Sequence, residues 1–235
     1  MSSTVTPAPA DVAVASRANE RAVFDWLFVV AVLAVAAVYV RAIWFTPMDA
    51  LQGLAQKIYY VHVPSAWSAM LAMGMVGLAS ILFLFLKDPR YDRFASASAE
   101  VGTAFSLVML TTGPLWARPI WNTWWTWDAR LTLTLMLFFL FVGYQVLRGA
   151  VADPGLRARY AAVVGICGMV LLPFIHLSVY LFRTLHPMPI VLKPSRPSLP
   201  GSMLVTLLLS VGVFTLLYVG FVMQRYAIGE RSDDA

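Results

Sequence analysis

Two of the three histidines in this chain stand at the ends of apolar runs, where a ring nitrogen could act as a ligand. His62 lies in the stretch Tyr59-Tyr-Val-His-Val-Pro64, and His186 lies in Arg183-Thr-Leu-His-Pro187. One such histidine alone is more typical of a polar residue at a membrane surface. Two neutral imidazoles from different elements, however, can ligate one metal from opposite sides, which is what a six-coordinate haem iron needs.

Tryptophan is concentrated in the stretch 113–130, which holds five of the chain's eight tryptophans. These five are Trp116, Trp121, Trp124, Trp125 and Trp127. If the stretch is helical after Pro119, one face of that helix carries Trp121, Trp124 and Trp125 together with Asp128. Such a helix would lie flat at the membrane interface. The flat rings would offer an apolar wall to a planar ligand. The alternative interpretation is an aromatic belt at the level of the lipid headgroups.

Arginines accompany the same stretch, and they could pair with carboxylates on a ligand. Arg118 and Arg130 flank the tryptophans, and Arg183 precedes His186. Simpler roles remain open for two neighbouring residues. Asp128 could be the N-cap of the next helix, and Arg130 could anchor that helix at the headgroups.

The composition indicates which elements must position these side chains. The chain has 235 residues, of which 60% are hydrophobic and 12% charged, with a mean hydropathy of +0.75. A soluble domain has about 45–50% apolar and about 25% charged residues, so a soluble enzyme is excluded and no separate soluble domain fits. The net charge of +5 is better explained by membrane orientation than by nucleic-acid binding.

Six apolar runs are each long enough to cross a bilayer as a helix. The expected spans are 24–45, 64–86, 97–115, 129–147, 160–182 and 201–223. We therefore expect an all-α polytopic membrane protein in which the tryptophan-rich segment joins the third and fourth helices. Residues 24–223 would form one six-helix domain, 1–23 a disordered tail and 224–235 a C-terminal tail.

The distribution of Lys and Arg predicts the orientation of these spans. Ten of the 17 basic residues fall on the side of the two termini and seven on the other side, which favours cytoplasmic termini. The stretches around His62, His186 and the tryptophans would then all face outward.

The fifth expected span carries the remaining histidine and the only cysteine. An ionisable residue inside a membrane is a functional candidate, so His176 could be a residue that supports a ligand, a proton relay or a core histidine, and we favour the last. Cys167 lies in an apolar run and is expected to pack in the core. One cysteine permits neither an intramolecular disulfide nor a cysteine-based metal cluster.

Three motifs together resemble a known family. They are Trp124-Trp-Thr-Trp-Asp-Ala-Arg-Leu-Thr132, Tyr60-Val-His-Val-Pro64 and Thr184-Leu-His-Pro187. The chain is similar over nearly its whole length to the cytochrome c maturation protein C family, also called haem exporter protein C, whose signature is a tryptophan-rich "WWD" segment. Asn122 departs from the pattern, since the family has Gly at this position.

The resemblance implies that haem b is presented at the periplasmic face of the bacterial inner membrane for the biogenesis of c-type cytochromes. His62 and His186 would be the axial ligands, the five tryptophans with Asp128 the platform, and Arg118, Arg130 and Arg183 the candidates to neutralise propionates. The implied partners are a periplasmic haem chaperone that receives the haem, a small single-span membrane subunit, the subunits of an ABC transporter, and membrane lipid.

Two other functions stay open. A b-type cytochrome subunit of a membrane redox complex would usually bury its ligand histidines between facing helices, whereas His62 and His186 stand at helix ends. A proton-coupled transporter using His176 and Arg183 would be expected to carry carboxylates or broken helices in mid-membrane, and the spans contain almost none. The sequence has no Gly-x-x-x-x-Gly-Lys-Ser/Thr pattern for ATP, and we do not expect an enzyme.

Overall fold

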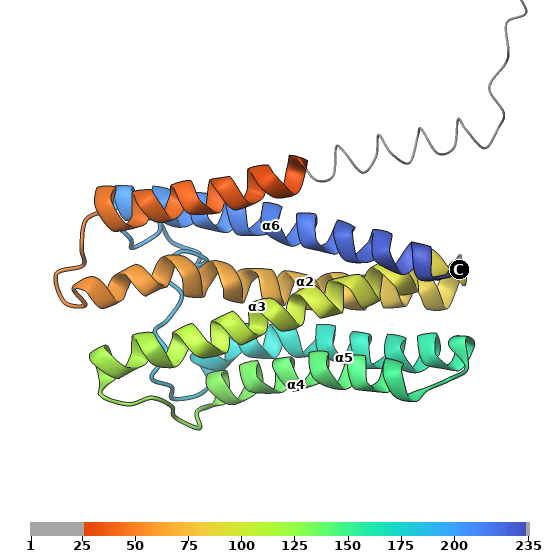
Figure 1. The fold of residues 1–235 in the computed structure, drawn as a ribbon. Helices are drawn as coiled ribbons and strands as arrows, with labels where there is room; N and C mark the ends of the chain where they lie inside the picture. The colour runs from red at the N-terminus through yellow and green to blue at the C-terminus, as the bar shows by residue number, and fades with distance from the viewer. Residues whose placement is uncertain (1–25, 234–235) are drawn as a thin grey trace, which may run out of the picture.

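The computed structural model describes residues 26–233, which form an antiparallel bundle of six helices (Figure 1). The first helix is Trp26–Phe45. It is followed by α2 (Tyr59–Leu86), α3 (Pro89–Trp121), α4 (Ala129–Ala150), α5 (Pro154–Leu181) and α6 (Gly201–Asp233). All six are long and apolar enough to span a membrane. The predicted all-α polytopic membrane fold is confirmed, while the tail predicted at 1–23 lies outside the described residues.

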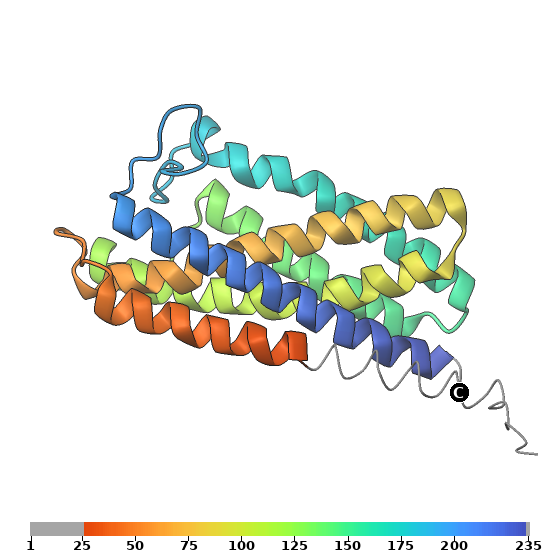
Figure 2. The same cartoon turned by 90° about the horizontal axis from the view of Figure 1, so that it is seen from above.

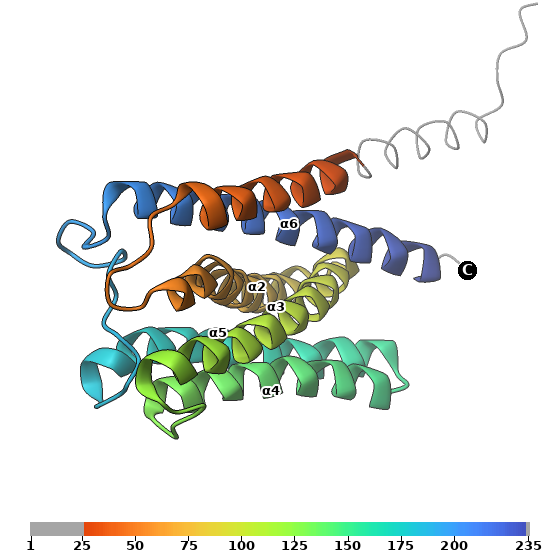
Figure 3. The same ribbon diagram turned by 60° about the vertical axis from the view of Figure 1, so that its left-hand side comes forward.

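The helices are arranged in three tiers (Figures 1 and 3). The first helix and α6 form one tier, α2 and α3 the middle tier, and α4 and α5 the third. The first helix packs on α6 through the rings of Phe28 and Phe221, whose centroids are 5.1 Å apart. The middle tier is the centre of the bundle, because α2 contacts α3, α5 and α6 while α3 also contacts α4 and α6.

Three helices begin at an aspartate that caps the free backbone N–H groups of the first turn. Asp88 accepts a hydrogen bond from the Arg90 N–H (2.9 Å), and Asp153 accepts one from the Leu156 N–H (2.7 Å). Pro89 and Pro154 follow these two caps, where proline is favoured because its fixed φ suits the first helical position. Asp128 caps α4 in the same way, which confirms the simpler of its two expected roles.

The two ends of the bundle differ in chemistry. One end contains the start of α2, the end of α3, the start of α4 and the segments 122–128 and 182–200, and we call it the tryptophan end (Figure 2). Ion pairs join the helices at the opposite end. Arg148 on α4 pairs with Asp92 on α3 at 2.6 Å, and Arg225 on α6 pairs with Glu100 on α3. These pairs fix α4 and α6 to α3 far from the tryptophan end.

The tryptophan segment does not form the flat interfacial helix that we considered from the sequence. α3 continues through Pro114 and Pro119 as far as Trp121, and residues 122–128 then form an irregular connection to α4. Asn122 ends the helix with φ 54° and ψ 24°, a left-handed conformation that breaks the helical path. The tryptophans therefore belong to one helix end and one loop, and they do not share a helix face.

Two predictions for the fifth span are wrong, because His176 and Cys167 are both exposed on the surface of α5. The outside of a membrane bundle faces lipid tails that are as apolar as its core. Apolar neighbours along the chain therefore cannot tell a lipid-facing position from a buried one. At the C-terminus, α6 remains helical to Asp233, well past the expected end of the span at residue 223.

Candidate functional site

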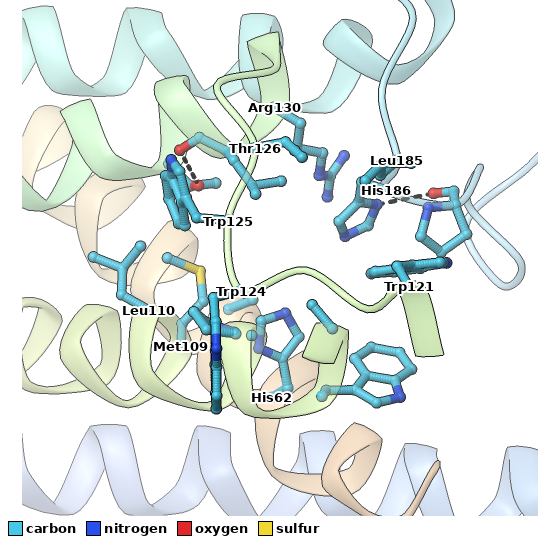
Figure 4. A pocket seen from close by; sticks show the side chains of 18 of the residues that line it. His62, Met109, Leu110, Trp121, Trp124, Trp125, Thr126, Arg130, Leu185 and His186 are labelled. Atoms are coloured by element: carbon cyan, nitrogen blue, oxygen red, sulfur yellow. Dashed lines mark hydrogen bonds between the residues drawn. The ribbon is translucent and has the colours of Figure 1, made fainter. Parts of the chain in front are cut away.

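A pocket that opens to the outside lies at the tryptophan end. Its walls come from α2, α3, the 122–128 loop, α4, α5 and the segment 182–200. Figure 4 shows that the rings of His62 and His186 point into this common space from different elements.

His62 lies in the first turn of α2, as the sequence predicts. Its Nδ1 is 3.1 Å from the hydroxyl oxygen of Thr112 on α3, and its ring centroid is 5.8 Å from that of Trp116. A Cβ atom placed on Gly113 would lie 3.1 Å from the Cε1 of His62. The absence of a side chain at Gly113 thus gives the imidazole the space it occupies against α3.

His186 lies in the segment 182–200, which crosses the tryptophan end on its way from α5 to α6 (Figure 3). Its Nδ1 is 2.9 Å from the carbonyl oxygen of Pro187, and its backbone N–H donates to the hydroxyl of Thr184 at 3.1 Å. Burial, with a smaller contribution from the positive charge of Arg130, lowers the pKa of His186 to about 4. The ring is therefore neutral at pH 7, as a metal ligand must be.

Four of the five predicted platform tryptophans line the pocket: Trp116, Trp121, Trp124 and Trp125. Trp116 is buried at 8% exposure, and its indole N–H donates to the side-chain oxygen of Gln52 at 3.0 Å. Trp124 is more than half exposed at the rim. Trp127 does not line the pocket, because it is 77% exposed and only meets Trp125 edge to face.

Of the three candidate arginines, Arg130 alone contributes to the pocket wall. Its guanidinium donates a hydrogen bond to the backbone carbonyl of Ile175 at 3.3 Å, and no ion pair of Arg130 is found among the described residues. Arg118 is exposed, where it donates to Asn122 and lies 5.9 Å from the ring of Trp124. Arg183 is also exposed on the segment 182–200. Arg130 is thus the pocket's available positive charge.

Asp128 ties the tryptophan segment to the segment that carries His186. Its carboxylate accepts from the Leu131 N–H (3.1 Å) and from the Thr126 hydroxyl (2.9 Å), and it also hydrogen bonds to Thr184 and to the backbone of Leu185. Burial raises the pKa of Asp128, but these hydrogen bonds outweigh burial and leave the pKa lowered. The ionised carboxylate therefore has a structural role and is not part of the pocket lining.

Sequence reasoning did not identify several residues that shape the site. Thr112 and Gly113 contact His62 from α3, and Gln52 holds Trp116. The sequence contained one relevant signal, since Thr112, Gly113 and Pro114 interrupt an apolar helix. Gln52 lies in a polar connection that carries no comparable pattern.

Taken together, the fold and the site define a class of multi-pass membrane protein in which one end of the bundle forms an aromatic pocket containing two histidines and one arginine. Comparison with known sequences places the chain more narrowly. The family model described as Heme exporter protein C matches residues 10–232, and the chain belongs to this family. The predicted resemblance is confirmed.

Individual relatives agree with this assignment. The chain is 41% identical over 198 residues to the Heme exporter protein C of Bradyrhizobium diazoefficiens, covering 84% of this chain and 74% of the relative. It is 37% identical over 191 residues to that of Haemophilus influenzae, covering 81% and 78%. A putative cytochrome c biosynthesis ccmC-like mitochondrial protein of Marchantia polymorpha is 36% identical over 194 residues, covering 82% and 81%.

Proposed function

We propose that this chain binds haem in the pocket at the tryptophan end, with the iron between His62 and His186, and that it passes the haem on during the biogenesis of c-type cytochromes. One observation carries the proposal. Two histidines that are far apart in sequence point into one pocket walled by tryptophans (Figure 4).

The residues present fit haem as the bound substrate. The porphyrin is flat, and the rings of Trp121, Trp124 and Trp125 offer apolar faces along the pocket. The iron has two axial positions, which two neutral imidazoles can fill. Haem propionates are carboxylates, and Arg130 supplies a guanidinium that can bind a carboxylate through two N–H groups.

The small number of candidate metal ligands in the protein favours a metal whose other coordination positions are filled by a cofactor. Among the described residues, no group of three or more His, Cys, Asp or Glu side chains converges on one point. An iron held by a porphyrin needs only axial ligands from the protein. The single Cys167 is exposed on α5, so we propose that the haem is non-covalently held haem b.

The names of the relatives support the haem-handling role. Relatives that cover most of this chain are named Heme exporter protein C, and the Marchantia protein is named for cytochrome c biosynthesis. The alternative of a proton-coupled transporter required His176 to lie inside the bundle. His176 is exposed on the surface of α5, which disfavours that alternative.

We further propose that the protein lies in the bacterial inner membrane with both termini in the cytoplasm, so that the pocket faces the periplasm. A periplasmic haem chaperone would then take the haem from the water side, where Trp124 and Trp127 are exposed beside the pocket. A small single-span subunit and ABC transporter subunits would complete the complex. Covalent attachment of haem would be carried out by residues of the chaperone, so this chain is not itself an enzyme.

The ligand assignment is tested by absorption spectra of the full chain purified in detergent and loaded with haemin. We expect a Soret band in the wild type. His62→Ala and His186→Ala should each change that spectrum and lower haem occupancy, because a single imidazole leaves one axial position open. His176→Ala is the matched control, since it removes the third histidine from the outer surface of α5. Wild-type spectra and occupancy in both single variants would overturn the assignment.

Delivery needs a separate measurement, namely the rate of haem transfer from the loaded protein to purified chaperone. Trp127→Ala should slow transfer and leave the Soret band unchanged, because Trp127 is exposed and does not line the pocket. Trp26→Ala is the control. Trp26 is 71% exposed, close to the 77% of Trp127, and it lies at the start of the first helix, away from the tryptophan end. Equal transfer rates for wild type, Trp127→Ala and Trp26→Ala would remove Trp127 from the contact surface.

A further inference from the structure

We propose that Thr112 is a positioning residue that fixes His62 as the Nδ1–H tautomer, so that the lone pair of its Nε2 faces the pocket. This inference rests on the proposed function in one respect, namely that the Nε2 lone pair is intended for iron. The tautomer itself follows from the hydrogen bonds of α2 and α3.

The argument begins with the single proton of the Thr112 hydroxyl. That oxygen lies 2.7 Å from the backbone carbonyl oxygen of Val108 and 3.3 Å from that of Met109. Carbonyl oxygens can only accept hydrogen bonds, so the hydroxyl proton is directed at them. This pairing of a threonine with the carbonyl four residues earlier is a regular feature of helices.

The same oxygen is 3.1 Å from the Nδ1 of His62. With its proton already donated, the hydroxyl can offer Nδ1 only a lone pair, so Nδ1 must carry the hydrogen. A neutral imidazole has one N–H, and Nε2 therefore remains unprotonated. The backbone of α3 thus determines, through Thr112, which nitrogen of His62 is free to bind a metal.

His186 reaches the same tautomer by a different route. Its Nδ1 is 2.9 Å from the carbonyl oxygen of Pro187, which also can only accept. A dashed line marks this hydrogen bond in Figure 4, where the ring of His186 points into the pocket. Metal-binding histidines commonly donate their second ring N–H to a carbonyl or a carboxylate, which fixes both tautomer and ring orientation.

The surroundings of Thr112 restrict the ring of His62 as well. Gly113 follows Thr112, and a Cβ at that position would approach the Cε1 of His62 to 3.1 Å. Trp116, one turn further along α3, lies 5.8 Å from the ring centroid. The imidazole therefore lies between a hydrogen-bond acceptor, a bare backbone and an indole, all supplied by α3.

The test is ¹⁵N NMR of histidine-labelled, haem-free full chain at pH 8, where an ordinary imidazole is neutral. In the wild type we expect His62 to show a protonated Nδ1 and an unprotonated Nε2. Thr112→Val keeps the size and the β-branch but removes the hydroxyl, so this signature should give way to a mixture of tautomers. Thr112→Ser restores the hydroxyl and should restore the signature.

A second readout links the tautomer to the ligand. Loss of a hydrogen-bond partner of a metal ligand typically weakens metal binding by about 10–100-fold, so haemin should dissociate at least about tenfold faster from Thr112→Val than from wild type or Thr112→Ser. A protonated Nε2 in the wild type, or the same nitrogen spectrum in Thr112→Val, would overturn the proposal. So would identical dissociation rates for Thr112→Val and wild type. A wild type without a Soret band would instead refute the proposed function, and the haem-free spectra would still decide the tautomer.

Discussion

At the scale of single residues, the candidate site places a neutral histidine next to a positive charge. Arg130 lines the same pocket as His186, and its charge adds to the effect of burial in lowering the pKa of His186 to about 4. The same charge favours an anionic group on the ligand. One arginine therefore disfavours protonation of a candidate metal ligand and favours a carboxylate on any ligand in the pocket.

This charge arrangement predicts how His186 titrates. In the wild type, the ¹⁵N shifts of His186 should change with a midpoint near pH 4, well below the ordinary value of about 6.5. Arg130→Gln should raise the midpoint because it removes a repulsive charge. The rise should stay incomplete, since burial is the larger cause. Arg118→Gln is the control, because Arg118 is exposed and outside the pocket lining. A wild-type midpoint near 6.5 would contradict the prediction.

At the scale of elements, the end of α3 decides where the tryptophans lie. Trp116 and Trp121 belong to the last turns of the helix, whereas Trp124 and Trp125 follow the break at Asn122. If the helix continued, the later tryptophans would follow its axis away from the pocket. The change in chain direction instead keeps both in the pocket lining, with the ring of Trp124 beside Arg118 of α3.

The stability of this break can be measured with substitutions at Asn122. Its φ of 54° is a left-handed conformation that glycine adopts freely, asparagine tolerates and β-branched residues resist. Asn122→Gly, which is the residue of the family pattern, should keep the thermal unfolding midpoint near that of wild type. Asn122→Val should destabilise the protein by about 1–2 kcal/mol. Equal midpoints for the two variants would show that the backbone at this position is not left-handed.

At the scale of the whole molecule, α2 connects the site to the core. It carries His62 in its first turn and packs against α3, α5 and α6. Its contact with α5 is close because a glycine on each helix faces a methionine on the other. A Cβ on Gly77 would lie 2.4 Å from the Cβ of Met169, and a Cβ on Gly168 would lie 2.3 Å from the sulfur of Met73. The short separation between α2 and α5 is therefore possible because Gly77 and Gly168 have no side chains.

Gly77→Ala should consequently separate α2 from α5. The obstructing atom is a Cβ, which cannot move without the backbone of α5, so we expect a loss of about 1–3 kcal/mol in unfolding free energy. Gly74→Ala is the control, one turn earlier on the same helix, where the nearest atom would be the Cδ1 of Leu172 at 3.7 Å. That variant should be neutral or slightly stabilising, because alanine favours helix over glycine. Chemical or thermal unfolding in detergent distinguishes the two variants, and equal losses would contradict the packing argument.

The sequence by itself determined the class of fold, the approximate position of each helix and a set of candidate residues for the site. Long apolar runs have few alternatives to membrane helices, since every backbone polar group in lipid must be satisfied within the segment. Asp128 also marked the start of α4 through local chemistry that needs no tertiary contact.

Only the tertiary structure decided which candidates meet. It brought His62, His186 and Arg130 to one pocket and left Arg118, Arg183 and Trp127 outside it. It also placed His176 and Cys167 on the surface and revealed the hydroxyl of Thr112 beside His62. The physical reason is that the lipid-facing side of a membrane helix is as apolar as the side that packs inside the bundle. Which face of a span is buried, and which distant side chains share a cavity, depends on how the helices pack.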